Sequence, residues 1–267
     1  MICDRRSGEE IHPQLRRTNM RMNLSPSLFC RSIVALWSVV LTSTLVAQPS
    51  AEEIIAGAKM VAVLQQADLQ GKMTKGSAQV PTALFLRQND IQFQYFENQQ
   101  WSKFHLRLKD EACEIFQMKA GKQTPFPLDQ IAKPIAGMDL SYEDLALRFF
   151  YWKNPQLEGE ERVGVHPCWK IRLNNPGQGG AYQVMYVWIH QKYGAFMKIE
   201  GFNRAGQILK RFEVTDVMKI GKNASGHDIY TLKQMNVSSM NPVNGRTASQ
   251  TKLIFEAPKS VELKGPR

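Results

Sequence analysis

Three short segments of the sequence contain side chains that could do chemistry, but none has the spacing of a known catalytic or metal-binding motif. His166 and Cys168 could both bind a metal ion, yet no third or fourth ligand stands nearby at zinc spacing. The glycines of residues 176–180 do not lead into a helix, as a phosphate-binding loop requires, and the acidic run 158–161 is interrupted by glycine and indicates a solvated turn. The sequence also lacks the GxSxG and HExxH motifs. It therefore predicts no enzyme, no metal site and no cofactor.

Two cysteines are candidates for a disulfide. Cys113 and Cys168 are the cysteines that follow the N-terminal apolar run, and they fall in different predicted strands. In an oxidising compartment such a pair forms either a disulfide or two buried free thiols. The sequence leaves both possibilities open.

The N-terminal apolar run predicts a signal peptide. Residues 32–46 are apolar and uncharged, which is shorter than the roughly 20 residues of a membrane span but suits a signal-peptide core. Arg31 supplies a positive flank, and Ala47 is a small residue at a suitable cleavage position. We therefore expect residues 1–47 to be cleaved after Ala47, which would deliver residues 48–267 to the periplasm as a single domain. An uncleaved N-terminal membrane anchor is the alternative.

The apolar run begins unusually deep in the sequence. Met20 or Met22 would each give a charged leader of ordinary length. We therefore expect residues 1–19 to come from an upstream start codon and to be absent from the natural protein.

The charge balance predicts an anionic partner. The 267 residues include 34 Lys and Arg against 24 Asp and Glu, for a net charge of +10. The hydrophobic content of 43% and the four cysteines exclude a disordered chain and a disulfide-dense miniprotein. A basic protein attracts nucleic acid, anionic lipid or an acidic protein surface. Export argues against nucleic acid, so the sequence favours a lipid or protein partner.

Two helical segments are predicted. Residues 51–66 place apolar side chains at helical spacing, and Ser50 with Glu53 forms a capping-box signature. A shorter helix is predicted at 140–146, within a proline-rich stretch. We expect the insertion at 138–152 to lie across one face of a sheet.

The rest of the chain alternates with period two, as strands do. Short turns such as Asn98-Gln99 separate the β runs, so neighbouring strands must be antiparallel, because a parallel crossover needs a dozen or more residues. The sequence therefore predicts one antiparallel sheet of about ten strands. The clearest β runs are 82–86, 91–95, 104–108, 182–189, 194–202, 207–218, 228–240 and 247–256.

Several of these β runs are apolar on both faces, which leaves two interpretations open. In the first, the sheet packs a solid core, and the chain is a secreted, non-catalytic β-rich binding module with a basic protein-docking face. In the second, the sheet bends around an apolar cavity that the helix at 51–66 and the insertion at 138–152 close.

A longer pattern resembles a known family. Residues 187–210, VWIHQKYGAFMKIEGFNRAGQILK, resemble the strand and hairpin that recur in the outer-membrane lipoprotein-sorting (LolA-like) family. The segments SYEDL at 141–145 and FYW at 150–152 match as well. The resemblance covers most of residues 52–258 and departs at His190, where an acid is more usual.

The resemblance implies a mainly β fold with helices (α+β), in which an unclosed, strongly curved antiparallel sheet forms a half-barrel with helices covering its concave face. It implies a periplasmic carrier that binds the acyl chains of lipoproteins or lipids in an apolar cavity and helps sort them to the outer membrane, without catalysis or a cofactor. The implied partners are acyl chains and inner- or outer-membrane transfer components. No nucleic-acid partner is expected, and the carrier is expected to be a monomer.

Aromatic and methionine side chains on the concave face are the candidates for contacting an acyl chain. Alternation along a strand does not distinguish the concave face from the convex one, so about half of these residues should belong to the ordinary core. The candidates are Phe85, Phe93, Tyr95, Phe104, Phe116, Tyr186, Trp188, Met197 and Phe202.

A basic stripe is predicted on one strand. Lys103 and Arg107 share a strand face with Trp101 and His105, and Phe104 points to the opposite face. If the apolar side faces the core, the stripe lies on the wet surface. It is then either a solvated face or a docking surface for an acidic membrane component.

Overall fold

The computed structural model describes residues 48–63, 65–119, 121–177, 179–222, 226 and 228–256, and these lie within one compact unit. The predicted signal peptide, its cleavage site at Ala47 and the alternative start residues lie outside the described residues.

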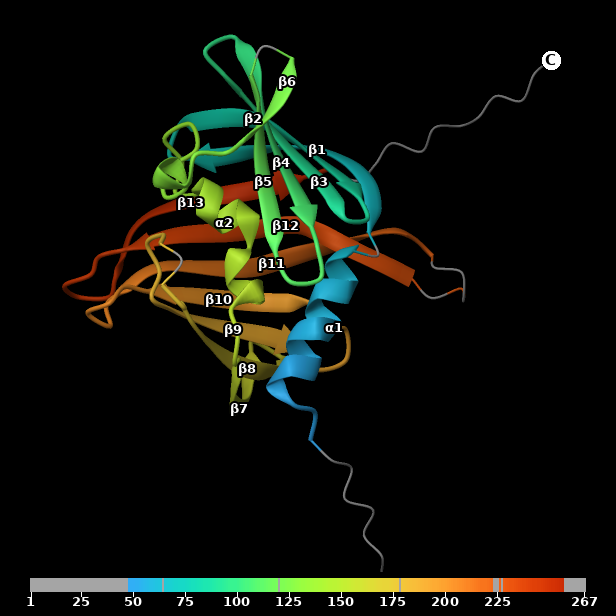
Figure 1. Ribbon diagram of the computed structural model, residues 1–267, viewed down its shortest axis with the longest axis vertical. Helices are drawn as coiled ribbons and strands as arrows, with labels where there is room; N and C mark the ends of the chain where they lie inside the picture. Colours follow the sequence, from blue (N-terminus) through green and yellow to red (C-terminus); the bar gives the residue numbers. More distant parts are fainter. Residues whose placement is uncertain are drawn as a thin grey trace, which may run out of the picture. The chain divides into compact units, whose positions relative to one another are not determined.

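One antiparallel sheet dominates the fold (Figure 1). Within the described residues, thirteen strands pair in the order β6-β5-β4-β3-β2-β1-β13-β12-β11-β10-β9-β8-β7. The predicted single antiparallel sheet is confirmed, with more strands than the ten that the sequence suggested. The strands are β1 (Gln66–Lys75), β2 (Ala78–Arg87), β3 (Asp90–Glu97), β4 (Gln100–Leu108), β5 (Cys113–Lys119), β6 (Lys122–Pro125), β7 (Gln156–Val163), β8 (His166–Asn174), β9 (Val184–His190), β10 (Phe196–Phe202), β11 (Ile208–Lys222), β12 (Asp228–Met240) and β13 (Thr247–Phe255).

The sheet is open, with β6 and β7 at its two edges. Each strand in a sheet is rotated by roughly 20° to 25° relative to the next, so the twist accumulates over the strand order. Figure 1 shows β3, β4 and β5 running steeply across the direction of β9 to β12. The unclosed sheet is confirmed, but the sheet is not strongly curled. The expected strong curvature is therefore wrong, because accumulated twist turns the two halves across each other.

Both sheet edges carry features that hinder pairing with another chain. β6 has four residues and ends at Pro125, which cannot donate a backbone hydrogen bond. β7 carries the acidic run 158–161 and has a register shift between Leu157 and Gly159. The acidic run was expected to be a solvated turn and is instead an edge strand, where charged side chains oppose aggregation.

The first helix is shorter than predicted. α1 (Ala51–Val63) begins at the predicted capping box, in which the Ser50 N–H donates to Glu53 Oε2 (2.8 Å) and the Glu53 N–H donates to Ser50 Oγ (3.2 Å). The helix was expected to reach Gln66, but Gln66 already pairs with β2 as the first residue of β1. The β1 sequence QADLQGKMTK has too few apolar residues for its alternation to stand out.

The topology forces one segment to cross the sheet. The chain leaves the sheet at the β6 edge and re-enters it at the β7 edge, so residues 126–155, the crossing segment, must pass over one face. This segment contains the short helices η1 (Leu128–Gln130), α2 (Tyr142–Ala146) and η2 (Arg148–Tyr151). In Figure 1, α1 and α2 lie on the same side of β9 to β12. The predicted placement of the insertion across one face is confirmed, and we call this face the inner face.

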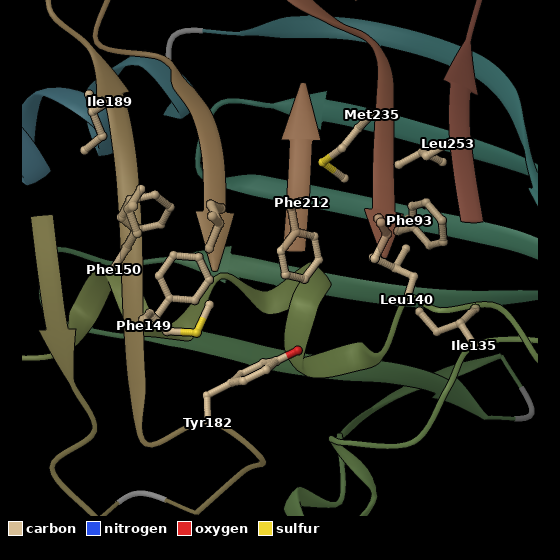
Figure 2. Close-up of a cluster of buried hydrophobic side chains, with 14 of the residues drawn as sticks. Phe93, Ile135, Leu140, Phe149, Phe150, Tyr182, Ile189, Phe212, Met235 and Leu253 are labelled. Atoms are coloured by element: carbon tan, nitrogen blue, oxygen red, sulfur yellow. The ribbon is translucent and has the colours of Figure 1, made fainter. Parts of the chain in front are cut away.

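The main core lies between the inner face and the crossing segment. Figure 2 shows Leu140, Phe149 and Phe150 of the crossing segment among side chains of the sheet such as Phe212 and Met235. A second, smaller cluster forms near β4, β5 and η1. The crossing segment therefore supplies a large share of the apolar surface that the sheet buries.

The glycine at the centre of β1 gives a stability test. A Cβ at Gly71 would lie 2.2 Å from the backbone oxygen of Ile254 and 2.7 Å from the Phe255 ring, where β1 pairs with β13. Gly71→Ala should therefore lower the free energy of unfolding by about 2 kcal/mol or more in urea titrations. Gly57→Ala is the matched control, because Gly57 lies in α1 with open space around it. That change should raise stability by up to about 1 kcal/mol. Equal effects of the two substitutions would contradict the β1–β13 packing.

Candidate functional site

An apolar cavity of about 250 Å³ lies between the inner face and the elements that cover it. α1 contributes Ala58 and Val61, and the crossing segment contributes Leu140, Leu145, Leu147 and Phe149. The sheet contributes residues of β2 to β4 on one side and of β10 to β12 on the other, such as Phe93 and Phe212. Two distant parts of the sheet therefore face one cavity.

One side of the cavity is open to solvent. Val217 of β11 and Tyr230 of β12 line the cavity, and they are 48% and 49% exposed. Exposed apolar side chains that continue into an apolar hollow are typical of ligand-binding grooves. We take this end as the mouth of the cavity.

The polar side chains in the cavity wall have partners. Thr231 Oγ1 donates to Gln65 Oε1 at 2.7 Å, and this pair lies near the mouth. Asp144 lies deeper and accepts from the Tyr182 hydroxyl (2.6 Å) and from Lys210 Nζ. The carboxylate of Asp144 is fully buried and satisfied, so it has the environment of a structural group. An apolar ligand that enters the cavity would therefore strip water from few polar groups.

Asp139 anchors one end of the crossing segment to the sheet. Its buried carboxylate accepts hydrogen bonds from Lys75 of β1 (2.9 Å), Ser239 of β12 (2.7 Å) and Thr251 of β13 (2.9 Å), and also from Ser249. Burial alone would raise the pKa of Asp139, but these hydrogen bonds outweigh it and lower the pKa below its usual value of 3.8. The carboxylate therefore stays ionised and holds residues near 139 against three strands.

A second pair of acids anchors α2. Glu143 accepts from the backbone N–H of Ala181 (2.9 Å), and burial raises the pKa of Glu143 despite that hydrogen bond. Gly180 has a φ of +93°, and a Cβ there would lie 2.0 Å from Glu143 Oε1. Together with the contacts of Asp144 to Tyr182 and to Lys210 on β11, these bonds fix α2 over the middle of the sheet.

The two cysteines of the described residues are free thiols. Cys113 lies on β5 and Cys168 on β8, the second strand from each edge of the sheet, so the disulfide alternative is wrong. Burial raises the pKa of Cys113 to about 12 and also raises the pKa of Cys168. Both thiols stay protonated at neutral pH, which makes them poor nucleophiles.

The structure separates the nine acyl-chain candidates into two groups. Phe93 lines the cavity, and Tyr95 and Phe104 lie on the inner face beside it, where both contact Tyr142 of α2. Phe85, Phe116, Tyr186, Trp188 and Phe202 lie on the opposite, outer face, and Met197 lies beside the register shift in β10. Only Phe93 of the nine lines the cavity, fewer than the half expected, and the choice of face on β9 and β10 was wrong.

The outer-face aromatics of β9 are covered by lysine side chains. Lys198 Nζ lies 4.1 Å from the centroid of the Trp188 ring, and Lys170 lies over both Tyr186 and Trp188. The Trp188 indole N–H donates to Glu161 (2.8 Å). Lysine stems and cation–π contacts therefore cover these rings, which explains how aromatic side chains can lie on the face away from the helices.

The cavity residues that the prediction missed are mainly aliphatic. On β9 the inner side chains Met185, Val187 and Ile189 are almost fully buried in the main core and do not line the cavity. On β10 and β12 the cavity is lined by Phe196, Ile199 and Leu232 among others. A search for aromatic residues could not identify these aliphatic cavity residues. Knowing which face of each strand is the inner face would have identified them.

The basic stripe lies on the outer face, as predicted for its strand. Phe104 is buried on the inner side, and Lys103 and Arg107 are exposed. Arg107 Nε donates to Asp90 Oδ1 at 3.1 Å and lies over the Phe116 ring, so part of the positive charge is paired. A docking role for the stripe stays a prediction.

The described residues contain no cluster of three or more His, Cys, Asp or Glu side chains arranged to hold a metal ion. Among the helices described, none is both long enough and apolar enough to span a bilayer.

Comparison with known proteins identifies the fold and a family. A family model with the description "Uncharacterized protein" matches residues 115–262, more than half of the chain, and the chain belongs to that family. None of the curated proteins compared with the sequence matches it.

Three solved structures share the fold at low sequence identity. A putative outer membrane lipoprotein-sorting protein domain from Vibrio parahaemolyticus is 14% identical, with a TM-score of 0.58 over 78% of this chain and 90% of that chain. A DUF1329 family protein from Desulfovibrio piger is 16% identical, with a TM-score of 0.57 over 81% and 95%. A LolA superfamily protein from Nitrosomonas europaea is 13% identical, with a TM-score of 0.54 over 80% and 96%. The predicted resemblance to the LolA-like family is thus confirmed for the fold.

The anchor at Asp139 gives a prediction for the crossing segment. Asp139→Asn removes the charge that faces Lys75 and weakens four hydrogen bonds at a buried site. The free energy of unfolding in urea should fall by about 2 kcal/mol, the usual scale for hydrogen bonds to a buried charge. Asp129→Asn is the matched control, because Asp129 is an exposed acid of the same segment. It should change stability by less than about 0.5 kcal/mol. An Asp139→Asn variant as stable as this control would contradict the anchoring role.

Proposed function

We propose that this protein, a chain with the LolA-like fold, is a non-catalytic carrier that binds acyl chains of lipids or lipoproteins in the cavity beneath the crossing segment. The observation that carries the proposal is the apolar cavity of about 250 Å³ with a mouth at Val217 and Tyr230. The fold is shared with proteins described as lipoprotein-sorting and LolA superfamily members, which supports this function class.

The energetics of acyl chains suit such a cavity. Removing a 16-carbon chain from a bilayer into water costs roughly 13 kcal/mol, at about 0.8 kcal/mol for each CH₂ group. A carrier lowers that cost by offering apolar surface to the acyl chain. The Leu, Val, Ile and Phe side chains that line this cavity provide such a surface.

The size of the cavity sets a limit on what it holds without rearrangement. The cavity is larger than the roughly 150 Å³ apolar cavity that accepts benzene, but smaller than the roughly 300–1,000 Å³ of typical ligand pockets. It therefore accommodates part of a long acyl chain. The rest of the chain would lie in the mouth or in space created when α1 or the crossing segment moves.

The same cavity counts against the main alternative. A binding module with a solid core would bury its apolar surface at close packing and leave few voids larger than a water molecule. A hollow of about 250 Å³ between the inner face and its cover is far larger than a water molecule. We also propose that the protein lies in the periplasm and carries its ligand to the outer membrane. These two parts of the proposal rest on analogy with proteins that share the fold.

Filling the cavity tests the proposal. Val214 of β11 lines the cavity, and Val214→Phe should occupy part of it. Binding of the neutral apolar fluorophore N-phenyl-1-naphthylamine, and its displacement by palmitate, should weaken by roughly tenfold or more. Val243→Phe is the matched control, because Val243 is 88% exposed in the turn after β12, and it should bind like the wild type. Native mass spectrometry of protein purified from its host should detect co-purified lipid or acylated peptide. An empty protein that also fails to bind the fluorophore would favour the solid-core module.

Export through the predicted signal peptide is tested separately. The intact mass of the protein recovered from its host should correspond to an N-terminus near Gln48, because cleavage is expected after Ala47. A mature protein that begins at residue 1 would contradict both the signal peptide and the proposed periplasmic location. Cavity variants serve as a control, because their intact mass should show the same N-terminus as the wild type.

A further inference from the structure

The turn between β9 and β10, residues 191–195, forms part of the cavity wall beside α1. Gly194 and Ala195 line the cavity together with Val61 of α1. The packing is close, because a Cβ added to Gly194 would lie 3.2 Å from Cγ2 of Val61, and Gly194 has a φ of +65°. The position of this turn therefore determines where the α1 wall of the cavity can lie.

His190, the last residue of β9, holds this turn in place. Its Nδ1 accepts hydrogen bonds from the backbone N–H groups of Lys192 (3.1 Å) and Tyr193 (3.4 Å). Its backbone carbonyl accepts from the Gly194 N–H (2.9 Å), and its own N–H donates to the Ala195 carbonyl (2.8 Å). Nδ1 can accept only when the imidazole is neutral and carries its proton on Nε2. The turn is therefore built around an uncharged histidine.

The surroundings of His190 disfavour a second proton. His190 is 7% exposed, and the His166 ring of β8 lies 5.3 Å away, centroid to centroid. Burial first, and then the positive charges of His166 and Lys192, lower the pKa of His190 below its ordinary value of 6.5. Three further titratable side chains lie near His190 or its turn.

Those neighbours come from three elements. Cys168 of β8 pairs with His190 in the strand register and is a buried thiol. The Tyr193 ring of the turn lies 4.7 Å from the His190 ring, centroid to centroid. Glu160 of β7 is the nearby acid, but it accepts its hydrogen bond from Gln191 (2.9 Å).

We infer that His190 is a pH-sensitive positioning residue for the cavity: its neutral imidazole keeps the 191–195 turn against α1, and protonation of Nδ1 releases the turn and weakens the binding of apolar ligands. The effect on ligands rests on the proposed function. The release of the turn does not, because it follows from the two hydrogen bonds to Nδ1.

The sign of the effect follows from proton linkage. An unfolded or released His190 binds a proton more readily than the folded one, so acidification favours the released turn. The stabilising contribution of the neutral imidazole is complete above about pH 6.5 and is lost as the pH falls through the lower value of the folded state. A protonated Nδ1 carries an N–H group, so it would face the N–H groups of Lys192 and Tyr193 without an acceptor between them. The positive charge would also lie close to His166 and Lys192.

The test compares two variants across pH 5 to 8. N-phenyl-1-naphthylamine is the probe, because its own charge does not change in this range. Wild-type protein should bind the probe about fivefold or more weakly at pH 5 than at pH 7.5. His190→Asn should remove most of this pH dependence, because the Asn side-chain oxygen can accept from the same N–H groups and does not titrate. His166→Asn removes a neighbouring positive charge and should move the midpoint of the wild-type transition to higher pH.

Nuclear magnetic resonance of the ligand-free protein separates the switch from the proposed function. The backbone amide signals of Lys192 and Tyr193 should titrate together with the His190 ring protons in the wild type, and this needs no ligand. Coincident titration supports the switch even if the probe binds at no pH, a result that would overturn the proposed carrier. Amide signals that do not follow the His190 ring, or equal pH dependence of probe binding in wild type and His190→Asn, would overturn the switch. If His190→Asn fails to fold, two measurements still test the switch: the pH midpoint of probe binding in His166→Asn, and the titration of the amide and ring signals in the wild type.

Discussion

The path of the chain between β6 and β7 is the constraint on which the rest of the structure depends. These strands are the two edges of the sheet, so the connection between them must cross a face. Twelve strand spacings of about 4.8 Å would make a flat sheet roughly 58 Å wide. The 30 residues of the crossing segment (126–155) are long enough to span this width even with three short helices, and the twist of the sheet decides which strands they pass over. The inner face, the core and the cavity all follow from that crossing.

The cavity persists because the crossing segment is held at a few polar points. Asp139 bonds it to β1, β12 and β13, and Asp144 with Glu143 bonds α2 to β11 and to the segment before β9. Between these points the segment presents apolar side chains to the sheet without filling the space completely. Buried charges contribute more to specificity of position than to net stability, since their desolvation costs offset much of their attraction. Three carboxylates thus fix the distance between the crossing segment and the sheet, while the apolar space between them stays available.

The strands with strong alternation could be predicted from the sequence, and the face they present could not. β12 and β13 begin where they were expected, because their apolar residues alternate and turn residues end each run. β1 and β7 were missed, because the first is polar with a central glycine and the second is an acidic edge strand. Tyr186 and Trp188 show why the site was only partly predictable. β9 is apolar on both faces, and only the path of the crossing segment, a property of the whole topology, decides that Met185 and Val187 face inward.

The two sides of the cavity respond differently to acid. On the crossing-segment side, hydrogen bonds lower the pKa of Asp139 below 3.8, so its anchor keeps its charge at any pH near neutrality. On the α1 side, the turn depends on a neutral His190; burial lowers its pKa below 6.5, and acidification below that ordinary value favours the protonated, released form. Loss of the turn would free α1 at the Val61 contact while the crossing segment stays anchored. The α1 wall is therefore the part of the enclosure that can open under mild acid without disturbing the anchors that hold the fold together.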